Sequence, residues 1–199
     1  MIPLTYYRCQ LEDIPTLRKV AYAAFRTTFS AILNPEQMDY MLEKMYGEKV
    51  LIQDISNEDQ LFYMAYHKKQ VIGYISITTP EHFIKERTDH GQARNGSPAN
   101  LKVIKEYPHP VYILHKIYLS PEMKGRGLGR LLWQKAFDLI TAWSDKKPAL
   151  MILQVNRKNP AVNFYKHLGM KCMAKQDFVL EHGFEMNDYV MGIDINTKA

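Results

Sequence analysis

Apolar residues recur at two distinct periods along the chain, and these periods predict its helices and strands. Residues 4–9 form a short apolar and aromatic run that is typical of a strand. Helical spacing follows over residues 13–29, and a second helix should begin after Asn34 and end near Gly47. Because Asn34 precedes a proline and Gln37 stands three positions on, we expect a capping box at the start of that helix.

Short runs rich in β-branched and aromatic residues predict the rest of a sheet. Residues 61–66 and 71–77 flank a polar turn and should pair as a hairpin. The run 149–155 is apolar throughout, which is typical of a central strand covered on both faces. The other predicted strands are residues 111–119, 171–180 and 188–195.

Two further helices are expected in the second half of the chain. One is amphipathic and begins at about residue 128, and a short one lies between Asn159 and Gly169. Residues 80–110 are rich in turn formers, so we expect a long loop with at most a helical turn, either a partly disordered insertion or a substrate lid. No linker or repeat divides the chain, which predicts a single domain over residues 1–199.

The predicted element order is β-α-α-β-β-β-α-β-α-β-β, with about seven strands and about four helices. This order predicts the α/β (α+β) class, with helices flanking a twisted, mixed and mostly antiparallel sheet. A strand-helix-strand unit over residues 111–155 should contain a parallel pair joined by a right-handed crossover.

Composition narrows the class of protein. With 46% hydrophobic and 24% charged residues among 199, the chain should bury a core without help from metals or disulfides. Two cysteines make no disulfide framework, and the seven histidines lack metal-ligand spacing, so we expect no metal. No apolar run approaches the length of a membrane span, and the start lacks a leader pattern, so we expect a cytoplasmic protein without a membrane partner.

A net charge of +5 favours anionic ligands, but no dense basic block marks a nucleic-acid arm, so no nucleic-acid partner is expected. One loop concentrates positive charge between a predicted strand and a predicted helix. Glycine residues there let an anion approach backbone N–H groups, and the helix N-terminus adds partial positive charge. The loop and its flanking cation are Lys124, Gly125, Arg126, Gly127, Leu128, Gly129 and Arg130.

This loop matches neither a P-loop nor a dinucleotide fingerprint, because its glycines lack the required spacing. It resembles the acetyl-coenzyme A signature Gln/Arg-x-x-Gly-x-Gly/Ala of the GNAT superfamily of N-acetyltransferases, with Lys124 in the first position. The order of elements resembles the GNAT fold along the whole chain. Two further motifs resemble that family: the strand end Ile117-Tyr118-Leu119, and the pattern Asn159-x-x-Ala-x-x-Phe-Tyr-x-x-x-Gly, with Met170 in place of the usual Phe.

The resemblance implies an acyltransferase that uses acetyl-CoA and moves its acetyl group to a primary amine by direct attack in a ternary complex. Tyr165 would be the general acid, as the Tyr of the family's Phe-Tyr pair. The backbone N–H of Leu119 would donate to the reacting carbonyl oxygen. Asn159 and Asn163 would contact coenzyme A, although Asn159 is also explained as a helix cap.

The general base is left open by the sequence. Some relatives carry a Glu at the position of Ile113, which cannot accept a proton. His115 lies two residues on and on the same face of the strand, and it has a suitable ordinary pKa. The alternatives are that His115 is a structural side chain and that ordered water removes the proton.

The acetyl acceptor is expected to be a small-molecule amine. The chain is closest in appearance to the bacterial polyamine and diamine acetyltransferases, in Thr28-Phe29, in Asn34 and in residues 181–191. Their Gly-Asp-x-x-Gln-Thr-Asp pattern is changed here to residues 183–188, and Glu36, Glu181 and Glu185 are candidate contacts for a cation. The alternatives are a protein or peptide N-acetyltransferase and a silent acetyl-CoA sensor. Exposed edges of the last hairpin are compatible with a homodimer, as in many relatives.

Overall fold

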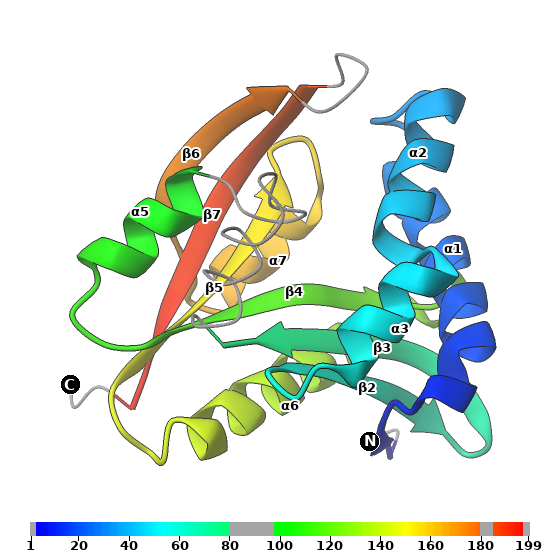
Figure 1. The fold of residues 1–199 in the computed structure, drawn as a ribbon, viewed down its shortest axis with the longest axis horizontal. Helices are drawn as coiled ribbons and strands as arrows, with labels where there is room; N and C mark the ends of the chain where they lie inside the picture. The colour runs from blue at the N-terminus through cyan, green and yellow to red at the C-terminus, as the bar shows by residue number, and fades with distance from the viewer. Residues whose placement is uncertain (1–2, 80–97, 180–184, 197–199) are drawn as a thin grey trace. The chain divides into compact units, whose positions relative to one another are not determined.

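The structure is a computed structural model that describes residues 3–79, 98–179 and 185–196 (Figure 1). The chain divides into two compact units. The first unit comprises residues 1–77 and 115–136, and the second unit comprises residues 78–114 and 137–199. Strands are hydrogen-bonded in the order β1-β2-β3-β4-β5-β7-β6, and β4 contributes residues to both units.

The first unit begins with β1 (Thr5–Arg8), a short 3-10 turn and three consecutive helices. These helices are α1 (Ile14–Phe29), α2 (Pro35–Tyr46) and α3 (Glu48–Ser56), and they are followed by β2 (Gln60–His67) and β3 (Gln70–Thr78). The predicted hairpin is confirmed, with its turn at Lys68 in the left-handed region at φ 56°. The third helix is not predicted, because the chain resumes helical geometry immediately after Gly47.

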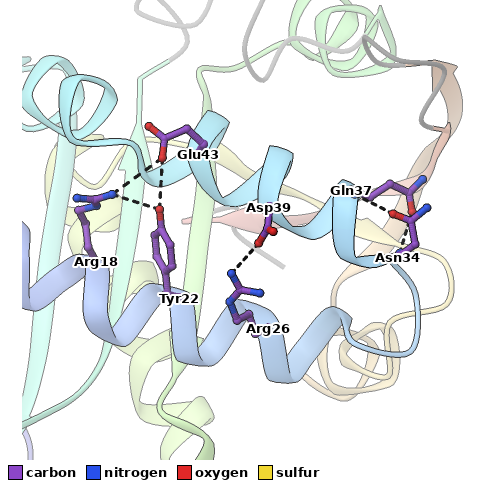
Figure 2. A network of polar contacts seen from close by, with 7 residues as sticks. All are labelled: Arg18, Tyr22, Arg26, Asn34, Gln37, Asp39 and Glu43. Atoms are coloured by element: carbon purple, nitrogen blue, oxygen red, sulfur yellow. Dashed lines mark hydrogen bonds and ion pairs between the residues drawn. The ribbon is translucent and has the colours of Figure 1, made fainter.

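Polar contacts join α1 to α2 on their exposed side (Figure 2). Arg26 pairs with Asp39 at 2.7 Å, and Arg18 and Tyr22 both lie near Glu43. The capping box predicted at the start of α2 is confirmed: the Gln37 backbone N–H donates to Asn34 Oδ1 at 2.8 Å, and the Asn34 N–H donates to Gln37 Oε1 at 3.0 Å.

The core of the first unit lies between these helices and one face of β2 and β3. Alternation along β2 directs Phe62 and Met64 into this core. Tyr63 lies between them in sequence and therefore points to the other face, where its ring contacts Lys135 of α6 (Leu128–Trp143). Fully buried members of the core include Leu17, Ala21, Leu42, Tyr46, Leu51 and Tyr74.

The second unit is built on β5 (Ala149–Asn156), β7 (Glu185–Ile195) and β6 (Lys171–Val179). The β5–β7 and β6–β7 pairs are antiparallel, as is β1–β2, whereas β4 (Val111–Leu119) runs parallel to β5. This arrangement confirms the predicted class and the predicted parallel pair. One face of these strands is covered by α5 (Pro98–Glu106), whose Val103 packs against Ile113, Ile152 and Val190.

The helix α5 corrects the expectation of a loop with at most a helical turn over residues 80–110. Its Leu101, Val103 and Ile104 supply an apolar face that packs on the sheet of the second unit. The remainder of the predicted loop, residues 80–97, lies outside the described residues. Over the ranges that the structure describes, no helix is long and apolar enough to cross a membrane.

Candidate active site

The glycine loop of the first unit connects the end of β4 to the start of α6. After Ser120 a single 3-10 turn covers Pro121–Met123, and Lys124 follows in extended conformation. Gly125 and Gly127 adopt φ angles of 75° and 74°, in the left-handed region that side chains avoid. The helix α6 then begins at Leu128, which is buried and anchors its first turn.

The charges of this loop are exposed. Lys124, Arg126 and Arg130 all lie on the surface, while Leu128 is 2% exposed. Lys124 Nζ also donates to Thr28 Oγ1 of α1 at 3.2 Å, which ties the loop to the first helix. Exposed cations beside a helix N-terminus favour an anionic ligand, so the loop stays a predicted anion site.

The end of β4 lies next to this loop in the first unit. Ile117, Tyr118 and Leu119 are all half-buried. The Tyr118 ring stacks on Tyr74 with centroids 5.6 Å apart, and Tyr74 donates a hydrogen bond to Tyr46 at 2.7 Å. Because both Tyr46 and Tyr74 are fully buried, desolvation raises their pKa values well above the ordinary value and keeps the phenols protonated.

A buried ion pair supports the same strand, and no local sequence pattern predicts it. Lys116 of β4 and Asp54 of α3 lie 3.9 Å apart, and the two side chains are 3% and 8% exposed. The ammonium also lies over the rings of Tyr46 and Phe62, at 5.8 and 5.2 Å from their centroids. Since a buried charge needs a counter-charge, Asp54 and Lys116 hold α3 and β4 together beside the predicted acetyl-donor strand.

His115, the candidate base, is half-buried on β4 in the first unit. Ile113, two residues earlier, is 2% exposed and belongs to the apolar cluster under α5 in the second unit. The structure therefore gives Ile113 a packing role, in agreement with the prediction that it is not a base. The assignment of His115 as base stays a prediction.

The candidate acid, Tyr165, lies on the short helix α7 (Ala161–His167) of the second unit and is 7% exposed. Burial raises the pKa of its phenol well above the ordinary value. The hydroxyl is thus protonated at every working pH and can donate a proton or a hydrogen bond. Its role as the acid stays a prediction.

The two asparagines of the predicted motif also lie in the second unit. Asn159 is half-buried, and its Oδ1 accepts from the Ala161 N–H at 2.9 Å in a local turn, but it is not the helix cap that the sequence predicts. The helix begins one residue later than predicted, because Pro160 occupies the cap position. Asn163 is exposed, and Gly169 ends the helix at φ 89° as expected.

A row of polar side chains crosses three strands of the second unit. Asp188 of β7 is the direct partner of Asn156 on β5 and of Gln176 on β6. Asp188 is 5% exposed and Gln176 is 7% exposed. Burial raises the pKa of Asp188 to about 6. The hydrogen bond from Asn156 and the charge of Arg157 oppose this rise.

No sequence motif predicts this row, because its members are far apart in sequence. Of its three members, only Asp188 belongs to a motif: it is the last residue of segment 183–188, which resembles the Gly-Asp-x-x-Gln-Thr-Asp pattern. Of the glutamates predicted to contact a cationic acceptor, Glu36 is exposed on α2 in the first unit and Glu185 is exposed on β7 in the second. Glu181 lies outside the described residues.

The remaining predicted site residues fall in both units. The loop, the end of β4 and His115 belong to the first, whereas Tyr165, Asn159 and Asn163 belong to the second. Within the described ranges, no three His, Cys, Asp or Glu side chains gather into a group that could hold a metal ion.

Comparisons with known proteins bear on this arrangement. Residues 20–170 match the acetyltransferase (GNAT) family. The chain is 26% identical to the uncharacterized N-acetyltransferase in the pepI 3′ region of Lactobacillus delbrueckii subsp. lactis, over 85% of each chain. It is 25% identical to spermidine N(1)-acetyltransferase of Thermoplasma acidophilum, over 89% of this chain and 96% of that protein.

The fold has a counterpart among solved structures. The PaiA N-acetyltransferase of Thermoplasma acidophilum, solved in complex with coenzyme A, superposes with a TM-score of 0.66 at 20% identity. The match covers 96% of this chain and 98% of the other. With the family match spanning most of the residues from α1 to the end of α7, the chain belongs to the acetyltransferase (GNAT) family and is an acyltransferase enzyme.

Proposed function

We propose that the protein is an acetyl-CoA-dependent N-acetyltransferase that transfers the acetyl group to a primary amine of a small molecule by direct attack in a ternary complex. The observation that carries this proposal is the loop of the first unit, where two left-handed glycines and exposed cations precede the N-terminus of α6. Polyamines are the proposed class of acceptor.

The loop fits the diphosphate of coenzyme A. A Cβ atom added at Gly125 or Gly127 would meet nothing within 4 Å, so the space beside both residues is open. Lys124, Arg126 and Arg130 would neutralise the phosphates, and the first backbone N–H groups of α6 would donate to them. The other proposed coenzyme A contacts are Asn159, Asn163, the buried Leu128 and the half-buried residues Ile117, Tyr118, Leu119 and Gly129.

When bound, acetyl-CoA supplies an activated carbonyl carbon and a thiolate leaving group. The Leu119 N–H would donate to the reacting carbonyl oxygen. An alkylammonium has a pKa near 10 and cannot attack until it loses a proton, which His115 or an ordered water would accept. Tyr165 Oη would give its proton to the departing sulfur, and the raised pKa of the phenol ensures that this proton is present.

A polyamine acceptor is supported by the relative from Thermoplasma acidophilum that acts on spermidine. The main alternative is a protein or peptide amine, which the same cofactor loop would serve equally well. A silent acetyl-CoA sensor is the second alternative, and the buried phenol of Tyr165 in the predicted acid position argues against it.

The test is release of free coenzyme A from acetyl-CoA, followed with a thiol reagent across polyamines, monoamines, amino sugars and short peptides. The reagent will also detect Cys172, which is exposed, so each rate is corrected with a blank that lacks acceptor. Cys9 should not contribute, because burial raises the pKa of its thiol to about 12.

We expect the polyamines to give the highest rates. Rates confined to peptides would establish the peptide alternative. Stabilisation by acetyl-CoA without turnover of any acceptor would establish the sensor. That the chain forms a single domain, acts as a homodimer and works in the cytoplasm are further parts of the proposal, and sedimentation of the purified protein tests the homodimer.

A further inference from the structure

We propose that Asp188, oriented by Asn156 and flanked by Gln176, binds the non-reacting ammonium group of a diamine or polyamine acceptor. This inference rests on the proposed function, since it names the residue that selects the acceptor. The Asp188 carboxylate would accept hydrogen bonds from the ammonium, and the Gln176 carbonyl oxygen would accept another.

The register of the sheet brings the three side chains together. Asp188 stands directly opposite Asn156 on one side and Gln176 on the other. Directly opposite residues share a face, with Cβ atoms about 5 Å apart. The next row along β6 and β7 on this face is Ala174 with Val190, and both belong to the apolar cluster under α5. Gln154 of β5 stands opposite Val190 in that row, so the row of Asp188 is the next one along and is polar on all three strands.

Two members of the row are buried and retain unused hydrogen-bonding capacity. Asp188 Oδ1 has no hydrogen-bond partner in the described part of the chain, and neither Oε1 nor Nε2 of Gln176 has one there. Both side chains are more than nine-tenths buried. Buried polar atoms normally have partners, because an unsatisfied one loses its hydrogen bonds to water without replacement. Two open acceptors, Asp188 Oδ1 and Gln176 Oε1, therefore stand on adjacent strands beside one open donor, Gln176 Nε2, and together they indicate a polar ligand with N–H donors.

The orientation of Asn156 shows that the row is built for a donor ligand. Asn156 Oδ1 accepts from the Lys158 backbone N–H at 3.0 Å, so its amide N–H₂ is the group that bonds Asp188. This bond fixes the carboxylate and leaves Oδ1 free to accept.

Arg157, whose charge lowers the pKa of Asp188, does not neutralise the carboxylate. The Arg157 guanidinium forms an ion pair with Asp177 and donates to Asn187 Oδ1 at 2.9 Å. Arg157 is thus held by other acceptors, and it lowers the pKa of Asp188 too little to offset burial. A carboxylate that is buried without a counter-charge favours a cation beside it, and a positively charged ligand would supply that cation.

The occupant follows from this chemistry. One carboxylate and one amide oxygen suit an alkylammonium, which presents three N–H donors, better than a metal ion that needs several charged ligands. In a diamine only the attacking nitrogen must be neutral, so the other nitrogen stays protonated and requires an anionic partner. Asp188 would supply it.

The decisive experiment compares a diamine with a monoamine of the same chain length, such as putrescine and butylamine, in the wild type and in Asp188→Asn. The substitution removes the charge and keeps the shape. We expect kcat/KM for putrescine to fall at least tenfold, while kcat/KM for butylamine and KM for acetyl-CoA change less than twofold. A folding defect would lower both amines together, so the ratio isolates the contact.

Two further variants sharpen the result. Gln176→Met removes polar atoms at similar size and without a change of charge, and it should lower kcat/KM for putrescine about threefold or more. Asp145→Asn is the matched control, because Asp145 is an exposed carboxylate in the same unit and pairs only with Lys147 among the described ion pairs. An equal loss of diamine preference in Asp145→Asn would show a general charge effect and would overturn the proposal, as would an unchanged ratio in Asp188→Asn.

Direct binding separates this inference from the proposed function. Putrescine binding to the wild type and to Asp188→Asn is measured by calorimetry without acetyl-CoA. Binding that is lost in the variant supports the site even if no amine is acetylated, in which case the proposed function alone fails. Equal affinity for both proteins overturns the site and leaves the proposed function standing.

Discussion

The buried carboxylate of Asp188 should lower the stability of the free protein at neutral pH, and replacing it with asparagine should raise that stability. Burial raises its pKa from 3.8 to about 6. A difference of this size corresponds to about 3 kcal/mol between the protonated and ionised forms. Because the asparagine keeps one hydrogen bond to Asn156 but leaves another polar group buried, we expect Asp188→Asn to gain about 1–3 kcal/mol at pH 8.

The pH dependence of this gain has a defined sign. Since the folded pKa lies above the unfolded one, the folded chain binds the extra proton between about pH 4 and pH 6. The contribution of protonated Asp188 to the free energy of unfolding is fully present below pH 4 and is lost as the pH rises through 6. The stability gap between variant and wild type should thus be small at pH 4, open across this window and stay constant above pH 7.

The assay is equilibrium unfolding in urea, followed by the fluorescence of Trp133 and Trp143 at pH 4, 6 and 8. A gain of 2 kcal/mol would raise the melting temperature by about 4–8 °C in a chain of this length. The control Asp145→Asn should change the free energy of unfolding by less than about 0.5 kcal/mol, because an exposed carboxylate remains hydrated in both states. A variant less stable than the wild type at pH 8, or an equal gap at pH 4 and 8, would refute the reasoning.

Three other predictions concern the acid, the loop and the buried ion pair. Tyr165→Phe should lower kcat about 100-fold and leave the acetyl-CoA dissociation constant within about twofold, and a kcat within twofold of wild type across pH 6–9 would exclude the phenol as the acid. Gly129→Glu places a negative charge in the first turn of α6, so calorimetry should detect no acetyl-CoA binding, while the circular dichroism spectrum should not change. Retained binding would show that the loop does not bind acetyl-CoA. Asp54→Asn leaves the Lys116 charge buried beside a neutral amide, so the free energy of unfolding should fall by about 3 kcal/mol in urea titrations. A loss below about 0.5 kcal/mol would show that the pair does not hold α3 to β4.

Local signals in the sequence account for most of the fold. The bounds of α1, of β4 and of the capping box at Asn34 all follow from patterns within a few residues. The third helix is not predicted because Gly47 ends one helix and directly precedes the next, and because Asp54 interrupts the apolar face of α3. Its burial depends on Lys116, which is distant in sequence.

Local motifs predict one part of the candidate site, and the other part depends on contacts between residues that are distant in sequence. The glycine loop and the helix of Tyr165 carry motifs of adjacent residues, and the sequence predicts both. The row of Asn156, Asp188 and Gln176 depends on the register of β5, β7 and β6, which no short motif specifies. A one-residue change in that register would move Asp188 to the opposite face of the sheet relative to its partners.

Transfer of the acetyl group itself is the most direct test of the central claim. The protein is incubated with acetyl-CoA that carries a ¹³C-labelled acetyl group and with putrescine, and the products are identified by mass spectrometry. We predict labelled N-acetylputrescine in amounts equal to the free coenzyme A, and loss of both products in Gly129→Glu. Free coenzyme A without a labelled amide, or no product with any amine or peptide, would contradict the account.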